Sequence, residues 1–244
     1  MSRPVKLVLA VLVGAVVLVT GGTWAYIHVI RGDPPAPLTL GSTATATTVA
    51  GASTDATVSG TSTAPSAGGD PGSVDGTWKV ATGSQAGYRV KEVLFGQSAT
   101  AVGRTSAVTG SVDIAGTTVK AADFSVDLTT VASDESRRDR QFQGRIMETS
   151  TYPTARFKLT SPIDVGTLPP AATQVKVNAT GELTLHGTTK TVTVPLQVQR
   201  SGATVRVAGT IPIVFADYGI PNPSAGPAST EDHGEIEFLL ALAK

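Results

Sequence analysis

Apolar and polar residues alternate with a period of two through most of the second half of the chain. The pattern is clearest in residues 181–198, GELTLHGTTKTVTVPLQV, where Leu183 and Leu185 alternate with polar residues. After a glycine-containing break at residues 187–190, the alternation resumes from Val192 to Val198. Successive side chains of a strand point to opposite faces, so each run has one apolar and one polar face. Two such runs joined by a short turn predict an antiparallel hairpin.

The same alternation between Gly76 and Lys244 predicts about eight strands separated by Gly, Pro, Asn and Asp. Antiparallel strands with one apolar face form a sandwich or a closed barrel, and a barrel of eight strands can hold one small ligand. Four small residues fall on the expected inner face and leave volume to be filled: Gly110, Ala179, Gly181 and Gly209. Pro195 and Pro212 lie inside strand runs and predict bulges or local breaks there.

One stretch, residues 133–152, does not alternate. Ser133 is suited to cap a helix, and the acidic residues 134–135 suit its first turn. The apolar residues that fall on one face at helical spacing are Phe142, Ile146 and Met147. Because Gly144 interrupts the pattern, we expect either one helix or two short helical turns, lying as a lid at a barrel mouth. The charges at 137–140 indicate a solvated face, or a pair between Arg138 and Asp139 that fixes the lid.

The N-terminal part of the chain predicts an anchor followed by a linker. Residues 7–30 contain no Asp, Glu, Lys or Arg and are long enough to span a bilayer as a helix. We therefore expect residues 1–32 to be a transmembrane anchor with its N-terminus in the cytoplasm, or alternatively a cleaved signal peptide; both export the remainder. Residues 33–75 are rich in Thr, Ala, Ser, Gly and Pro and predict a disordered linker. As a coil of about 43 residues it would reach roughly 35–40 Å, as a plain spacer or an O-glycosylated stalk.

Composition narrows the functional classes. The chain has 19 basic and 19 acidic residues and a formal net charge of zero, which gives no reason to expect nucleic acid as a partner. It contains no cysteine, so disulfides, thiol catalysis and Cys-ligated metals are excluded. The oligomeric state is left open.

Candidate catalytic residues are few. A metal site at Asp232, His233 and Glu235 is conceivable, but sequence neighbours on a loop are weak evidence for a closed site. His186 is a candidate catalytic base, although it has no evident nucleophile beside it. The chain has no P-loop and no G-x-S-x-G elbow. We therefore expect that the protein is not an enzyme and that it binds no cofactor and no metal.

Several separated motifs resemble the YceI-like, polyisoprenoid-binding family. They are Arg138-Asp139 with the following helical turn, Tyr152-Pro153 before the strand with Phe157, residues 181–187 (GELTLHG), residues 108–110 (VTG) and residues 215–220 (FADYGI). The resemblance covers residues 76–244. At two places the chain departs from the family pattern, with Gln141 where a His is usual and Ile146-Met147 where a Phe pair is usual.

The resemblance implies an extended lipocalin-like, eight-stranded antiparallel barrel that encloses a polyisoprenoid or a similar long-chain amphiphile. With the anchor, this predicts a membrane-tethered, extracytoplasmic binding protein of a bacterial envelope that stores, shields or transports the lipid. The alternative is an exported structural or interaction module with a filled barrel. The residues expected to contact the ligand are Tyr88, Phe124, Leu128, Phe142, Ile146, Met147, Phe157, Leu183, Leu185, Ile213, Phe215 and Phe238.

Overall fold

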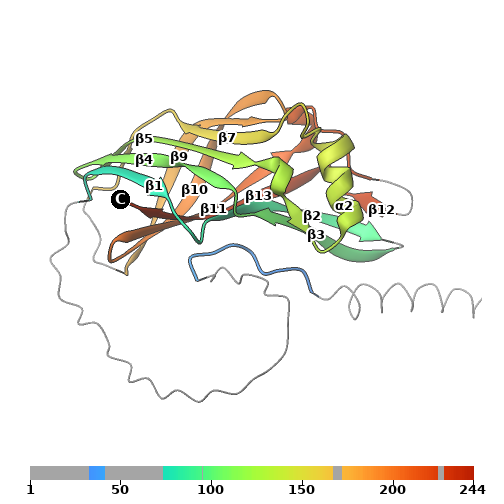
Figure 1. Ribbon diagram of the computed structural model, residues 1–244, viewed down its shortest axis with the longest axis horizontal. Helices are drawn as coiled ribbons and strands as arrows, with labels where there is room; N and C mark the ends of the chain where they lie inside the picture. Colours follow the sequence, from blue (N-terminus) through green and yellow to red (C-terminus); the bar gives the residue numbers. More distant parts are fainter. Residues whose placement is uncertain (1–32, 42–73, 95, 167–171, 225–227) are drawn as a thin grey trace, which may run out of the picture.

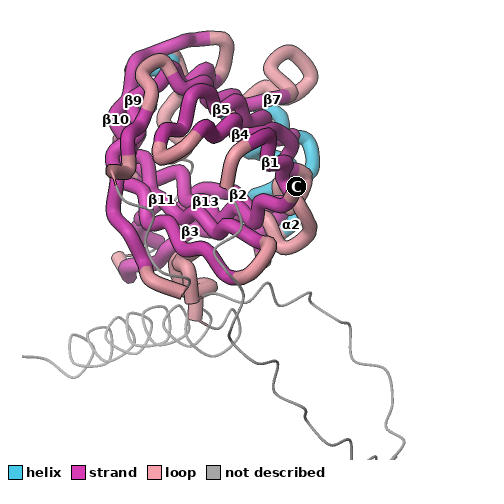
Figure 2. The backbone as a smooth tube through the Cα atoms, turned by 90° about the vertical axis from the view of Figure 1, so that its left-hand side faces the viewer, coloured by secondary structure: helices cyan, strands magenta, loops and turns pink. Residues whose placement is uncertain are grey.

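The computed structural model describes residues 33–41, 74–94, 96–166, 172–224 and 228–244. Within this part of the chain, eight antiparallel strands form a closed ring, which Figure 2 shows along the barrel. The order around the ring is β1-β4-β5-β7-β9-β10-β11-β13, and β13 pairs with β1 to close it. The strands of the ring are β1 (Gly76–Val80), β4 (Val108–Ala115), β5 (Thr118–Asp127), β7 (Thr154–Leu159), β9 (Gln174–Leu185), β10 (Thr188–Ser201), β11 (Thr204–Val214) and β13 (His233–Ala243).

Strand β13 is shared between two neighbours along its length. Its last residues pair with β1, whereas residues 235–239 pair with β2 (Gln85–Leu94). Strand β2 forms a hairpin with β3 (Gln97–Thr105), and the short strands β12 (Ala228–Thr230) and β6 (Ala132–Ser133) pair with β2 and β3. The short strand β8 (Ile163–Asp164) pairs with β5. The hairpin therefore extends the barrel wall at one end.

Short helices cover that end of the barrel, here called the mouth (Figure 1). They are η2 (Leu128–Thr130), α2 (Ser136–Gln141), the π-helical turn η3 (Phe142–Ile146) and η4 (Phe215–Tyr218). The segment of α2 and η3 is called the lid below. The helical turns α2 and η3 follow each other directly, and Gly144 lies within η3 instead of interrupting the segment. The prediction that Ser133 caps the helix is wrong. The N-cap is Glu135, whose carboxylate accepts from the backbone N–H of Arg137, because Ser133 belongs to β6.

The predicted hairpin at residues 181–198 forms, but its turn is shorter than expected. Strand β9 ends at Leu185 and β10 begins at Thr188, so the turn is His186-Gly187 rather than residues 187–190. Both turn residues have positive φ, 48° and 75°. Two-residue hairpins favour this backbone because its twist matches that of the strands.

Pro195 and Pro212 do not produce bulges: both lie in unbroken registers, opposite Asn178 and Glu235. A local break is present instead, because the β10–β11 ladder ends at Leu196 paired with Gly209. Each proline lies just beyond that end, on a stretch where its strand has only one partner. A missing N–H donor is tolerated where no ladder bond is made on that side.

Much of the volume left by the small inner residues is filled by aromatic rings from neighbouring strands. A Cβ added at Gly110, Gly181 or Gly209 would lie 2.8, 2.4 and 2.6 Å from a ring carbon of Phe124, Phe157 and Phe238. The same relation holds between Gly103 and the ring of Tyr88, at 2.4 Å. Each glycine therefore lets a ring lie flat against the strand beside it.

Residues 33–41, here called the strap, lie against the outside of the barrel below β2 and β3 (Figure 1). Leu38 and Leu40 are buried in a cluster with Ala208 and Leu239, on the outer faces of β11 and β13. The prediction that the whole of residues 33–75 is an unstructured linker is therefore wrong for the strap. The pattern Leu-Thr-Leu at residues 38–40 alternates like a strand within a segment otherwise poor in large apolar residues.

The predicted anchor at residues 1–32 and most of the predicted linker lie outside the described residues. Among the residues that are described, no helix has the length and apolar character needed to cross a bilayer.

Candidate functional site: a two-part apolar cavity

The interior of the barrel holds a deep cavity of about 230 Å³. Its wall comes from inward-facing residues of the ring strands, such as Val112, Val177 and Leu240. Among the residues that line it, only Thr117, Arg156 and Arg200 are polar, and the Arg156 side chain is 57% exposed. A chamber of this kind offers few hydrogen-bond partners to a polar ligand, and it suits a hydrocarbon chain.

A second cavity, of about 660 Å³, lies between the lid and the strands at the mouth. Its inner wall is apolar, with residues such as Leu185, Ile213 and Phe215. Its rim carries the charged and amide side chains of Glu92, Glu135, Arg137, Arg138, Gln141 and Glu235. This mouth cavity therefore combines an apolar wall with polar groups, whereas the deep cavity is apolar almost throughout.

The two cavities are adjacent, because Ala86, Val126, Ala155 and Ile236 line both. Ala86 and Ala155 are buried and have the smallest side chains at this junction. The interior thus has one axis, from a polar rim at the mouth through the junction to an apolar end. This polarity matches a molecule with one polar and one apolar end.

All twelve residues predicted to contact a ligand line one of these cavities. Four line the deep cavity: Phe124, Phe157, Leu183 and Phe238. Eight line the mouth cavity: Tyr88, Leu128, Phe142, Ile146, Met147, Leu185, Ile213 and Phe215. Phe215 does so from the start of η4 rather than from a strand, since β11 ends at Val214. That these side chains contact a ligand stays a prediction.

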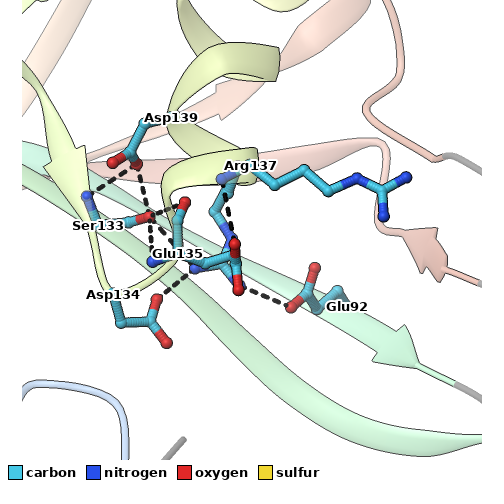
Figure 3. A network of polar contacts seen from close by, with 7 residues as sticks. Glu92, Ser133, Asp134, Glu135, Arg137 and Asp139 are labelled. Carbon is cyan, nitrogen blue, oxygen red and sulfur yellow. Dashed lines mark hydrogen bonds and ion pairs between the residues drawn. The ribbon is translucent and has the colours of Figure 1, made fainter.

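Polar contacts at Ser133 hold the lid to the wall of the barrel (Figure 3). The Asp139 carboxylate accepts from the backbone N–H and the hydroxyl of Ser133, at 2.9 and 2.6 Å. Arg138 donates to Asp134, which lies between β6 and α2, and its Nη2 lies 3.4 Å from Glu92 of β2. The expected direct pair between Arg138 and Asp139 is therefore wrong in detail: each residue ties the lid to a different partner.

Three further contacts hold the other side of the lid. Gln143 donates to the carbonyl of Thr129 at 3.1 Å, and Arg145 donates to the carbonyl of Pro223 at 2.9 Å. The ring of Phe142 stacks on Tyr88, with centroids 5.0 Å apart and planes at 17°. The lid is thus attached on both flanks and stacked over the mouth cavity.

Tyr88 lines the mouth cavity. Burial raises the pKa of Tyr88, and the carboxylates of Asp139, Glu92 and Asp134 raise it further. The phenol is therefore neutral at every physiological pH, and it shares a hydrogen bond with Ser133.

His186, the candidate catalytic base, is held by contacts within the fold. His186 Nδ1 lies 3.2 Å from the carbonyl of Tyr218, and its ring packs on Tyr152 at 4.6 Å between centroids. The carbonyl accepts, so Nδ1 carries the proton; His186 Nε2 is buried and has no partner among the described residues. His186 lines neither cavity.

His233 is exposed and lies between two carboxylates, 2.8 Å from Asp232 and 3.2 Å from Glu231. The hydrogen bond to Asp232 raises the pKa of His233. In the described part of the chain, no group of three or more His, Cys, Asp and Glu side chains is placed to hold a metal ion.

Several lining residues were missed by the sequence argument. The junction residues Ala86 and Ala155 gave no signal because alanine fits either face of a strand. The rim residues Glu92 and Glu235 were not identified as a group, because their approach to the mouth depends on the pairing of β2 with β12 and β13. The inward parity of Glu92 with Tyr88 and Val90 was the one available clue.

Comparison with known families gives a match over most of the barrel. The family model described as YceI-like domain matches residues 78–242. A UPF0312 protein of Vibrio parahaemolyticus is 31% identical over 103 residues, which cover 39% of this chain and 51% of that protein. The chain thus spans about half the length of the curated relative that it matches.

Comparison with solved structures also gives matches. A polyisoprenoid binding domain from Saccharophagus degradans superposes with a TM-score of 0.55 at 20% identity, covering 68% of this chain and 97% of that chain. The BcnA protein of Burkholderia cenocepacia matches with a TM-score of 0.48 at 24% identity, covering 63% and 95%. The first of these supports the closed antiparallel barrel described above.

Proposed function

Because the chain belongs to the YceI-like family, we propose that its barrel binds a polyisoprenoid or a similar long-chain amphiphilic lipid. The observation that carries the proposal is the two-part cavity, with an apolar deep end and a polar rim at the mouth. The related domain from S. degradans is described as polyisoprenoid binding, which points to the same class of ligand. The role is binding rather than catalysis.

The ligand enters through the mouth with its apolar chain towards the deep cavity. Burying one CH₂ group contributes about 0.8 kcal/mol, so a long chain has ample driving force to enter an apolar chamber. The polar end then lies at the rim, where Arg137, Arg138 and Gln141 of the lid supply hydrogen-bond donors. The net affinity is limited by the cost of ordering the chain.

The apolar segment at residues 7–30 supports a further part of the proposal, that the protein is tethered to a membrane with the barrel on the extracytoplasmic side. In this role it stores, shields or transports the lipid close to the bilayer.

The rings that fill the glycine positions favour a second candidate function. A barrel whose interior is largely occupied by Phe124, Phe157 and Phe238 would serve as an exported interaction module without a lipid.

A substitution at the junction separates the two functions. Ala155→Phe places a ring between the cavities, and Ala121→Phe places the same ring on the exposed outer face of β5 as a control. The full chain, produced in its native host, is subjected to native mass spectrometry and solvent extraction. Lipid binding predicts a long-chain adduct on the parent and Ala121→Phe proteins, and its loss or replacement by a shorter chain on Ala155→Phe. A bare polypeptide mass for all three, with no uptake of added isoprenoids, would refute lipid binding and favour the interaction module.

A further inference from the structure

The strap is held on the barrel by a buried carboxylate and three arginines. Glu237 of β13 is 2% exposed, and it lies 3.3 Å from Arg89 and 2.6 Å from Arg104. Its second oxygen also accepts from the backbone N–H of Leu38 at 3.3 Å. The strap therefore completes the partner set of a carboxylate that is cut off from solvent.

The arginines in turn bind carbonyls along the strap. Arg89 donates to Pro35 at 2.6 Å, Arg104 donates to Ala36, and Arg206 donates to Leu40 at 2.7 Å. These contacts span most of the strap, so it is fixed in position and in direction.

The direction of the strap follows from the levels of its partners along the barrel. Arg89 pairs with Glu235 near the mouth, whereas Arg206 pairs with Ala241 towards the opposite end. Since Arg89 binds Pro35 and Arg206 binds Leu40, the strap begins on the mouth side and runs away from it. The chain that precedes Asp33 therefore joins the barrel from the mouth side.

The connectivity places the apolar segment close to this point. Only Arg31 and Gly32 separate Ile30 from the strap, and three residue steps span at most about 11 Å. Residues 42–73, in contrast, join Gly41 to Val74, whose carbonyl accepts from the indole N–H of Trp78 at 2.7 Å. Both ends of that segment are attached to the barrel, so it does not set the distance between the apolar segment and the barrel.

We propose that the strap holds the mouth of the barrel against the membrane that contains the N-terminal segment. The inference rests on the membrane tether of the proposed function. It places the barrel in contact with the membrane, instead of at the end of a linker that reaches roughly 35–40 Å. The exposed large hydrophobic side chains of the described residues, Val93 and Val214, both lie at the mouth end, where a bilayer surface would cover them.

Two matched insertions test the strap. The same flexible 20-residue Gly/Ser segment is inserted before Asp33 in one variant and between residues 57 and 58 in the other. Because the chain has no cysteine, V93C at the mouth and S201C at the far hairpin each give one labelling site. The full chain is reconstituted into phosphatidylcholine vesicles, and energy transfer from each label to a headgroup-labelled lipid is measured.

We expect at least twofold more efficient transfer from the V93C label than from the S201C label in the parent chain. The insertion at 57–58 should preserve this ratio, and the insertion before Asp33 should bring it close to one. Equal transfer from both labels in the parent, equal effects of the two insertions, or release of the chain from vesicles by alkaline carbonate would each overturn the proposal. Lipid loading is assayed on the same samples by extraction; its absence with the ratio intact would refute lipid binding while supporting the strap.

Discussion

The alternating sequence of strand β13 suggests one buried face and one solvent-exposed face, but residues on both faces are buried. Its inner face contributes Ile236, Phe238 and Leu240 to the cavities. Its outer face would ordinarily meet water, yet Glu237 and Leu239 are 2% and 1% exposed beneath the strap. Alternation thus identifies which residues share a face, but not what covers that face.

A second ion pair lies on a part of the outer surface of the barrel that is exposed to solvent. Arg156 of β7 pairs with Asp123 of β5, and their side chains are 57% and 40% exposed. In the pair of Arg104 with Glu237 the exposed fractions are 21% and 2%. The Arg156–Asp123 pair is therefore solvated, whereas the Arg104–Glu237 pair is buried and helps to attach the strap.

The largest effect is expected on the inner face. Phe238→Glu places a carboxylate without a partner in the apolar interior and removes a ring that covers Gly209, so lipid loading should be abolished. Loading is measured by extraction, with circular dichroism to establish folding. Phe238→Leu, which remains apolar, should keep most of the loading. Full loading of a folded Phe238→Glu protein would place this side chain outside the ligand path.

The next effect is expected beneath the strap. Glu237→Ala leaves Arg89 and Arg104 facing each other without their carboxylate, and should lower the free energy of unfolding by about 3 kcal/mol. Glu235→Ala on the same face, where the side chain is exposed, should change it by about 0.5 kcal/mol or less. Urea denaturation of both proteins gives the comparison. Equal losses would show that the cover over Glu237 has no energetic consequence.

A smaller change is expected at Gly209. An added Cβ lies 2.6 Å from Phe238 and 3.0 Å from Leu196, and both contacts are with side-chain atoms that can shift. Gly209→Ala should therefore cost about 1–2 kcal/mol and turn the Phe238 ring into the deep cavity. Lipid extracted from this variant should be shorter or less abundant. An unchanged lipid profile would show that the ring has room to move elsewhere.

The smallest effect is expected at the exposed pair. The hydrogen bond from Arg156 lowers the pKa of Asp123 in the folded protein. The stability from this pair is therefore present above the unfolded pKa of about 3.9 and is lost as the pH falls through the folded value. Asp123→Asn should lower the Tm by about 2 °C or less at pH 7, and the difference should vanish at acid pH. A difference that does not shrink as the pH falls would have another origin.

The barrel could be predicted from the sequence because the alternation of apolar and polar residues is repeated in many strands. Residues such as Phe124, Leu183 and Phe238 occupy the apolar positions of their alternating runs, which was enough to place them inside. The resemblance to a known family predicted that the strands close into a barrel. The prolines identified where β10 and β11 separate, although the consequence was a ladder end rather than a bulge.

What could not be predicted depends on contacts between distant segments. Glu237 and the strap are nearly 200 residues apart in the chain, and only folding brings them together. Likewise, Ser133 resembled a helix cap, but pairing of β6 with β3 assigned it to a strand. Local signals of this kind are overridden when a distant strand supplies a competing set of hydrogen bonds.

The attachment of Gly41 and Val74 to the same barrel has a consequence for how the chain can vary. The entropy of closing a chain segment between two fixed ends grows only with the logarithm of its length, so doubling the length costs about 0.6 kcal/mol. Insertions and deletions between residues 42 and 73 should therefore accumulate among homologues with little penalty. The two residues between Ile30 and Asp33 have no such freedom, and their number should be nearly constant.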